Sequence, residues 1–224
     1  MLPFDTELAS LIDHTCLRPD ALGEEIDRLC DEARTFQFRT ACVQPVFVAR
    51  AAGRLAGSGV GVAAVVAFPH GVVTTDAKVF ECRRALDDGA TELDVVANLG
   101  WIRGGDTAAL TAEIAEIVTS TAGAIVKVIL ETAMFTEHQK QTAAQAVMKA
   151  GPAFLKTSTG FGPGGATLAD VALLRRIAGS RAQVKASGGI RTRAEALAMR
   201  AAGADRLGAS ASIALVTLNT DPES

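Results

Sequence analysis

Two hydrophobic patterns alternate along this chain. Short runs of mostly apolar residues have the length of buried strands, and they span residues 11–15, 40–43, 61–68, 92–97, 125–130, 153–158, 183–186 and 206–208. Between these runs, apolar residues recur every three or four positions, as on one face of a helix. The helical segments span residues 21–36, 45–55, 75–87, 106–119, 136–150, 167–177, 192–202 and 210–216.

The order of these segments predicts the fold class. Alternating strands and helices indicate a parallel sheet, and eight such units predict a closed (β/α)8 barrel, one domain over residues 1–224. Residues 1–9 are expected to form a short polar cap. An open doubly wound sheet is the alternative, but it needs a glycine-rich turn after the first strand to bind a dinucleotide. No such turn follows His14.

Composition limits which binding partners and which cellular compartment we expect for this protein. The chain has 224 residues, 49% of them apolar, and a net charge of −3 without a Lys/Arg-rich run, so we expect no nucleic-acid partner. It has no 18-residue apolar run and no signal-peptide pattern at its start, so we expect neither a membrane span nor secretion. The scattered cysteines fit a reducing cytoplasm; they are Cys16, Cys30, Cys42 and Cys82. Neither they nor the three histidines have metal-ligand spacing, so we expect no metal.

Charged residues interrupt four consecutive apolar strands. Each follows or lies between apolar neighbours, so strand alternation places it on the opposite face. The outer face of a barrel strand packs under helices, so these side chains are expected to point into the barrel. The four residues are Asp94, Lys127, Lys156 and Lys185.

Two of these lysines suggest chemistry. Adjacent strands lie about 4.8 Å apart, which would bring the ammonium groups of Lys156 and Lys185 to roughly 4–5 Å. Like charges at that distance repel by about 4 kcal/mol at an effective dielectric constant of about 20, or roughly three pKa units. Burial would lower the pKa further, while Asp94 would oppose the fall. A lysine tuned in this way attacks carbonyls to form a Schiff base.

Glycines follow the last three strands, where barrels of this type bind phosphate. Gly160 follows the sixth strand, Gly188 and Gly189 the seventh, and Gly208 the eighth. Helices expected to open at Thr192 and Ser210 would add backbone N–H groups. Together these positions predict a phosphate site at the carboxyl ends of the strands.

Several stretches of the chain resemble deoxyribose-phosphate aldolase, over about residues 10 to 213. They are LIDHT (11–15), AFPHG (67–71), ELDVV (92–96), VKVILET (126–132), FLKTSTG (154–160) and VKASGGIR (184–191). The resemblance implies reversible cleavage of 2-deoxy-D-ribose 5-phosphate to glyceraldehyde 3-phosphate and acetaldehyde, without a metal or other cofactor. It also implies small-molecule sugar phosphate and aldehyde substrates and a homodimer or homotetramer.

The resemblance also implies roles for individual residues. Lys156 matches the Schiff-base lysine, Lys185 the lysine that lowers its pKa, and Asp94 the aspartate that moves protons with water. We expect Lys127 and Thr157 to support this polar core. The positions that match phosphate loops are Gly160, Gly188, Gly189, Gly208 and Ser210.

The chain departs from some members of that family at two places. Those members place a lysine after the Thr-Ser-Thr-Gly stretch, where this chain has Phe161, so phosphate must be held mainly by backbone N–H groups. Some members also end in a tyrosine that assists proton transfer. This chain has no tyrosine, and its tail, residues 219–224, is polar and expected to be mobile.

Some alternatives stay open at this point. Another lysine-dependent aldolase acting on a sugar phosphate, or a non-catalytic sugar-phosphate-binding barrel, would share part of the pattern. His70 lines the pocket or is structural, and Glu131 orients a lysine or caps its strand. We expect Cys42 to be a pocket wall, His138 to be solvated and Trp101 to anchor the start of a helix.

Overall fold

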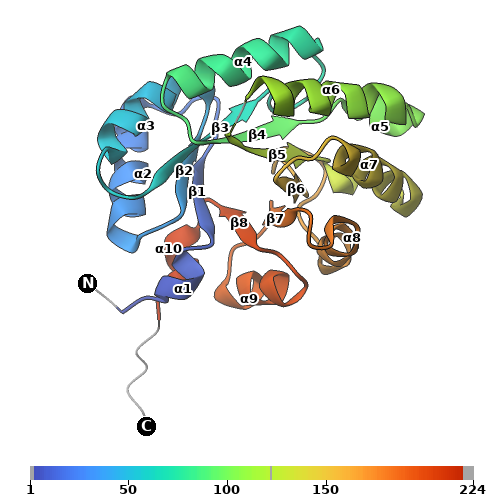
Figure 1. The fold of residues 1–224 in the computed structure, drawn as a ribbon. Coiled ribbons are helices and arrows are strands. Elements are labelled where there is room, and N and C mark those ends of the chain that lie inside the picture. The colour runs from blue at the N-terminus through green and yellow to red at the C-terminus, as the bar shows by residue number, and fades with distance from the viewer. Residues whose placement is uncertain (1–2, 122, 219–224) are drawn as a thin grey trace.

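The computed structural model describes residues 3–121 and 123–218. Eight parallel strands close into a barrel in the order of the chain, with helices around the outside (Figure 1). The strands are β1 (Ile12–Cys16), β2 (Thr40–Val43), β3 (Gly61–Val66), β4 (Glu92–Val96), β5 (Ile125–Ile129), β6 (Phe154–Lys156), β7 (Gln183–Ser187) and β8 (Arg206–Ala209). The predicted (β/α)8 barrel is therefore confirmed.

A helix follows each strand, and several of the helices begin at a residue whose side chain caps them. The helices are α1 (Thr6–Ala9), α2 (Gly23–Phe36), α3 (Val48–Leu55), α4 (Thr75–Asp87), α5 (Leu99–Gly104), α6 (Thr107–Ser120), α7 (Glu137–Lys149), α8 (Leu168–Ala178), α9 (Arg193–Ala201) and α10 (Ser212–Val216), with two short 3-10 turns, η1 (Pro45–Phe47) and η2 (Thr132–Met134). Thr74 caps α4 and Thr136 caps α7, each by accepting a backbone N–H three residues on.

Two strands, β3 and β6, end two residues earlier than the hydrophobic pattern predicted. β3 stops at Val66 because Ala67 turns into a left-handed conformation, with φ of 52°. β6 stops at Lys156, although the buried run continues through Thr159. After β3, Ala67 and Phe68 are partly buried, so of these two strands only β6 is followed directly by buried residues.

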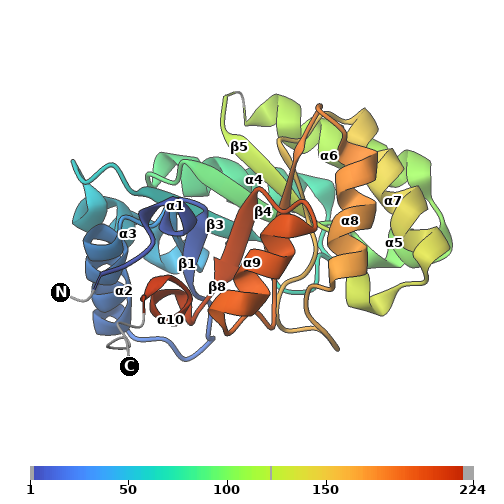
Figure 2. The ribbon, with the colours of Figure 1, turned by 90° about the horizontal axis from the view of Figure 1, so that it is seen from below.

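The main core lies between the strands and the helices. Outward side chains such as Leu155 and Val184, which are register partners on β6 and β7, are fully buried there. Figure 2 shows the helices packed along the strands. A second, smaller apolar cluster of Leu17, Cys42, Ala63, Val65 and Phe68 comes from β2, β3 and the loops after β1 and β3. Beside β2 and β3, apolar side chains therefore pack together, while charged side chains occupy the rest of the barrel interior.

The first residues of the chain do more than form the polar cap that we predicted. Leu8 and Ala9 of α1 are fully buried, and α1 contacts α10, beside which it lies in both views (Figures 1 and 2). Within the described ranges, no helix has both the length and the apolar character to span a membrane. The predicted tail at residues 219–224 lies outside the described residues.

Candidate active site

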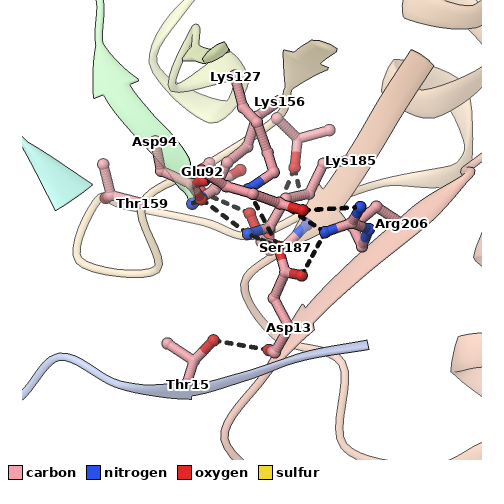
Figure 3. Close-up of polar contacts among 12 residues, drawn as sticks. Asp13, Thr15, Glu92, Asp94, Lys127, Lys156, Thr159, Lys185, Ser187 and Arg206 are labelled. Carbon is pink, nitrogen blue, oxygen red and sulfur yellow. Dashed lines mark hydrogen bonds and ion pairs between the residues drawn. The ribbon is translucent and has the colours of Figure 1, made fainter. Parts of the chain in front are cut away.

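A cluster of charged side chains occupies the barrel interior (Figure 3). Its members come from six strands, each is at most 5% exposed, and they are Asp13, Glu92, Asp94, Lys127, Lys156, Lys185 and Arg206. We call these seven residues the barrel cluster. The four charged residues predicted to point inward do so, and three more join them.

Asp94 is the centre of the barrel cluster. Its Oδ2 accepts hydrogen bonds from Lys156 Nζ at 2.6 Å and Lys185 Nζ at 2.7 Å, and its Oδ1 accepts one from Lys127 Nζ at 2.7 Å. Strand register explains this convergence, because Asp94 pairs with Lys127 and Lys156 pairs with Lys185 across neighbouring strands. Since one oxygen binds both amines, Lys156 and Lys185 are as close as strand spacing predicted.

The other cations have additional carboxylate partners. Lys185 also binds Asp13, and Lys127 Nζ lies 2.6 Å from Glu92 Oε2. Arg206 Nη1 donates to Asp13 Oδ1 at 2.6 Å and to Glu92 Oε2 at 2.8 Å. Within the described chain, Lys156 is the member of the cluster with a single carboxylate within 4.0 Å.

These contacts separate the lysines by charge state. Burial lowers the pKa of Lys156 below its ordinary value; Asp94 opposes the fall and Lys185 adds to it. Burial acts on Lys185 and Lys127 as well, but Asp13 and Asp94 outweigh it and raise the pKa of both lysines. Burial also favours neutral Asp94, yet the three lysines hold the pKa of its carboxyl well below the usual range. Lys156 is therefore the lysine that most readily presents a free amine.

A cavity of about 510 Å³ opens above the Lys156 amino group. Lys156 and Lys185 line it, together with the loops that follow β1, β6, β7 and β8. These loops meet at the carboxyl ends of the strands, which is the active-site end of such barrels. The arrangement allows a carbonyl carbon to reach Lys156 from solvent.

All the residues predicted for phosphate binding line the same cavity; they are Gly160, Gly188, Gly189, Gly208 and Ser210. Gly160, Gly188 and Gly189 have positive φ, which glycine adopts without strain. Gly208 has another reason to be glycine, because a Cβ there would lie 3.0 Å from Lys185 Cε. At Gly208 the missing side chain makes room for a lysine of the barrel cluster.

Of the two predicted helix N-termini, the one at Thr192 is present and the one at Ser210 is displaced. α10 begins at Ser212, so Ser210 lies in the turn before the helix and does not open it. Thr192 does cap α9, but Glu195 accepts the backbone N–H groups of Arg191 and Thr192 at 2.8 and 3.0 Å. Those two amides already donate to the side chain of Glu195 in the first turn of α9. Thr192 is also not among the described residues that line the cavity.

Glu131 adopts neither role that the sequence left open. It has a φ of 49°, its side chain is buried, and its carboxylate accepts the backbone N–H of Thr159 at 3.2 Å as well as the Thr159 hydroxyl. A Cβ on Gly162 would lie 2.8 Å from Glu131 Cδ, so the loop folds closely over this carboxylate. Glu131 therefore holds the loop that follows the Lys156 strand.

Thr157 connects the ends of two neighbouring strands. Its hydroxyl donates to the carbonyl of Ser187 at 3.2 Å and accepts the Ser187 N–H at 3.1 Å, so it joins the ends of β6 and β7. Lys156 and Lys185 occupy these two strands. The predicted supporting residue thus fixes the spacing of the two lysines through the backbone.

The remaining singled-out residues divide between wall and surface. Cys42 is buried in the smaller apolar cluster, and burial raises the pKa of its thiol. It is not among the described residues that line the cavity, so it is not the pocket wall that we expected. His138 is exposed as predicted, and Trp101 lies in the short helix α5, which the pattern had not shown. His70 is exposed and is not among the described residues lining the cavity. His14 does line it, with Nε2 2.8 Å from Glu32 Oε2.

Sequence reasoning missed three members of the barrel cluster, although the signal was present. Asp13, Glu92 and Arg206 all lie on short strands that we had predicted. Glu92 is two residues before Asp94, so strand alternation already placed both on the inner face. Arg206 is two residues before Gly208, so strand alternation likewise places these two residues on one face of their strand. No group of His, Cys, Asp or Glu side chains within the described ranges is arranged to hold a metal ion.

A closed barrel with a lysine amine at the bottom of its cavity defines a class of enzyme, the aldolases that react through a lysine. Residues 8–215 match the model of one family, described as DeoC/LacD family aldolase. The chain belongs to the DeoC/LacD aldolase family. It is 47% identical over 210 residues to deoxyribose-phosphate aldolase from Bacillus cereus strain AH187, covering 93% of this chain and 94% of that one. It is 46% identical over 213 residues to the enzyme of that name from Desulfitobacterium hafniense, covering 94% and 98%.

A solved structure agrees with this assignment. Deoxyribose phosphate aldolase from Aeropyrum pernix, described as having a unique tetrameric structure, superimposes with a TM-score of 0.88 at 35% identity. The match covers 94% of this chain and 89% of that one. The whole barrel is therefore shared with that protein.

Proposed function

We propose that this protein catalyses the reversible cleavage of 2-deoxy-D-ribose 5-phosphate to D-glyceraldehyde 3-phosphate and acetaldehyde. The observation that carries the proposal is Lys156, whose pKa is lowered by burial and which opens onto the cavity. The names of the relatives support the choice of substrate. The glycine loops at the same cavity supply backbone amides of the kind that bind a phosphate.

The proposed reaction begins at the aldehyde of the open-chain sugar. The Lys156 amine attacks C1 and loses water to form a protonated imine. The C3 hydroxyl gives up its proton and the C2–C3 bond breaks, so its electron pair passes to the imine. This step releases glyceraldehyde 3-phosphate and leaves an enamine on Lys156. Protonation at C2 and hydrolysis of the resulting imine then release acetaldehyde.

Asp94 is the proposed acid–base group for these proton transfers, working through water. It is the carboxylate that contacts Lys156, at 2.6 Å. Its lowered pKa keeps it ionised, so by itself it is a weak base and a good partner for the protonated imine. Lys185 is proposed to stay charged and to position Asp94. Lys127 is proposed to act in the same way on the other oxygen.

A trapping experiment tests the covalent step. The purified protein is incubated with acetaldehyde and sodium cyanoborohydride, and the modified residue is located by peptide mass mapping. We expect an ethyl adduct on Lys156. An adduct on Lys185 would exchange the two roles, and a protein that cleaves the sugar phosphate without trapping would contradict the mechanism.

A charge substitution tests the phosphate end. Ser210 is exposed, lines the cavity and has no positive φ, so substitution there brings no backbone strain. Ser210→Asp should lower kcat/KM for 2-deoxyribose 5-phosphate about tenfold or more through repulsion, with little change for 2-deoxyribose. Ser210→Asn is the matched neutral control. Gly189→Val would also obstruct an anion, but its φ of 81° would strain any side chain and so affect both sugars.

A non-catalytic sugar-phosphate-binding barrel would bind the substrate without turnover, and another lysine aldolase would prefer a different sugar phosphate. A panel of sugar phosphates, assayed for cleavage products, separates these possibilities from the proposed one.

We also propose that the reaction needs no metal or other cofactor. Turnover should survive exhaustive treatment with EDTA, and loss on chelation with recovery on adding zinc would contradict this.

We further propose that the chain, residues 1–224, acts as one domain in a homodimer or homotetramer in the cytoplasm. The tetrameric description of the Aeropyrum pernix protein supports assembly. The four cysteines, which are free thiols, fit a reducing compartment. Sedimentation equilibrium would give the oligomeric state, and a monomer at all working concentrations would exclude assembly.

A further inference from the structure

The barrel cluster contains an unequal number of acids and bases. Its carboxylates are Asp13, Glu92 and Asp94, and its cations are Lys127, Lys156, Lys185 and Arg206. With every group charged, three negative charges would face four positive ones in a buried site. An uncompensated buried charge is costly, so neutralising one cation stabilises the cluster.

The contacts select which cation is neutralised. Lys127, Lys185 and Arg206 each bind two carboxylates, whereas Asp94 is the one carboxylate of the described chain within 4.0 Å of Lys156. With Lys156 neutral, three cations balance three carboxylates. The ease with which Lys156 loses its proton therefore depends on all the charges of the cluster and not on the pair Lys156 and Lys185 alone.

Two members of the cluster contribute to this count from a distance. Neither Glu92 nor Arg206 is among the described residues that line the cavity. Both lie at the first residue of their strands, at the end of the barrel opposite the cavity. The Arg206 guanidinium also lies over the ring of Phe154, 5.2 Å from its centroid.

We propose that Arg206 and Glu92 set the charge state of Lys156 without touching the substrate. Arg206 occupies two carboxylates that would otherwise attract a proton onto Lys156. Glu92 holds Arg206 and Lys127 in place and limits the excess of positive charge. Both are positioning residues for the amine, and this role rests on the proposed Schiff-base function of Lys156.

Charged or titratable groups face Lys156 from most of the surrounding strands. β3 contributes only apolar side chains to this side within the described ranges, namely Ala63 and Val65. Arg39 lies 3.8 Å from Glu92 but is exposed, so solvent screens it. The remaining groups are Asp13 on β1, Cys42 on β2, Glu92 and Asp94 on β4, Lys127 on β5, Lys185 on β7 and Arg206 on β8.

Removing one charge at a time gives opposite results. Arg206→Gln leaves three carboxylates with two fixed cations, so Lys156 keeps its proton to higher pH. Glu92→Gln leaves a surplus of positive charge, so Lys156 loses its proton at lower pH. Each shift should be about one pH unit, as expected for a full charge about 10 Å away at an effective dielectric constant of about 20. At neutral pH, Arg206→Gln should slow trapping about tenfold.

The double variant separates charge balance from structural damage. Arg206→Gln combined with Glu92→Gln again leaves one surplus cation, so its pH profile should return to within a few tenths of a unit of the wild type. Arg206→Lys keeps the charge and should show little shift. Arg193→Gln is the matched control outside the barrel, because Arg193 pairs with Asp5 there at 2.6 Å, and it should leave the profile unchanged.

The experiment measures the initial rate of cyanoborohydride trapping of acetaldehyde on Lys156 from about pH 5 to about pH 10, with circular dichroism as the folding control. The proposal is supported by opposite shifts in the single variants and recovery in the double. It is overturned if Arg206→Gln shifts the profile to lower pH or not at all, or if the double variant is displaced further. Should Arg206→Gln fail to fold, Glu92→Gln and the double variant decide alone. A wild type without any adduct on Lys156 would instead contradict the proposed function.

Discussion

Buried lysines occur in two regions of this barrel, and their surroundings differ. Inside the barrel, Lys127 and Lys185 each bind at least two carboxylates. Outside it, between α4 and α6, Lys78 Nζ binds Glu113 Oε2 at 2.9 Å and the carbonyl of Val96 at 2.8 Å. Lys78 and Glu113 are both buried, with no carboxylate besides Glu113 within 4.0 Å of Lys78 in the described ranges.

The difference appears in their charge states. Burial lowers the pKa of Lys78, and the attraction of Glu113 only partly opposes it. Burial raises the pKa of Glu113 in the same way. Lys127 and Lys185 are as deeply buried, yet their pKa values rise because several carboxylates face them. The number of carboxylates around a buried lysine therefore decides whether it keeps its proton.

Lys156 belongs to the barrel cluster but behaves like Lys78. Both have one carboxylate partner and a lowered pKa. Lys156 opens onto the cavity, whereas Lys78 is fully buried and is not among the described residues that line it. A reactive amine thus needs two conditions, few carboxylates and access for a substrate, and Lys78 meets only the first.

The largest effect is expected from Lys156→Leu. Without the nucleophile, no Schiff base forms, and kcat/KM for 2-deoxyribose 5-phosphate should fall by at least about a thousandfold. Trapping with acetaldehyde should vanish. A variant that keeps a tenth of wild-type turnover would show that another residue carries the covalent step.

Lys185→Leu should have the next largest effect. Removing this cation leaves Asp13 and Asp94 to attract the proton of Lys156, so the pKa of Lys156 should rise by up to about three units. The free amine is then lost at neutral pH, where turnover should fall about a hundredfold or more. It should return as pH rises toward about 10, because the amine deprotonates there. Trapping as fast as wild type at neutral pH would refute the charge coupling.

Lys78→Leu tests the role of the buried lysine that lies outside the barrel. It leaves the Glu113 carboxylate buried and unpaired, so the free energy of unfolding should fall by about 3 kcal/mol in urea titration. The loss should grow as pH rises, because buried Glu113 is then harder to keep neutral. Trapping on Lys156 below the unfolding transition should not change. The double variant Lys78→Leu, Glu113→Leu should recover most of the stability.

The smallest effect is expected from deleting residues 220–224. If the charges inside the barrel alone make Lys156 reactive, this polar tail contributes little, and turnover should stay within a few-fold of wild type. The chain has no tyrosine that the tail could supply. A collapse in kcat with an intact circular dichroism spectrum would show that the tail takes part in proton transfer.

Strand alternation predicted most of the barrel and the inner position of four charges. It did so because a parallel strand buried on both faces has few reasons to carry Lys or Asp unless they are paired. The spacing of Lys156 and Lys185 followed from strand register alone. Local patterns are sufficient wherever neighbours in the sheet are also neighbours in the chain.

Other parts of the site were beyond such patterns. Repulsion by Lys185 was our main explanation for a reactive Lys156, but burial is the larger cause and Asp94 opposes it more than Lys185 adds to it. Asp13 and Arg206 are 193 positions apart, so no local pattern could show that they touch. The helix expected at Ser210 begins two residues later, because the chain first turns over the cavity. Glu131 contacts a loop whose path the sequence does not reveal.

The closure of the barrel between β1 and β8 has a consequence for how the chain acquires its activity. Asp13 on β1 meets Lys185 and Arg206 only across sequence separations of 172 and 193 residues. Contacts of such long range form slowly, since the ends of a long loop must first find each other. During synthesis, Asp13 is made 193 residues before Arg206. Recovery of turnover on refolding should therefore lag behind the recovery of helix. The return of enzymatic activity then reports the time at which the barrel closes between β1 and β8.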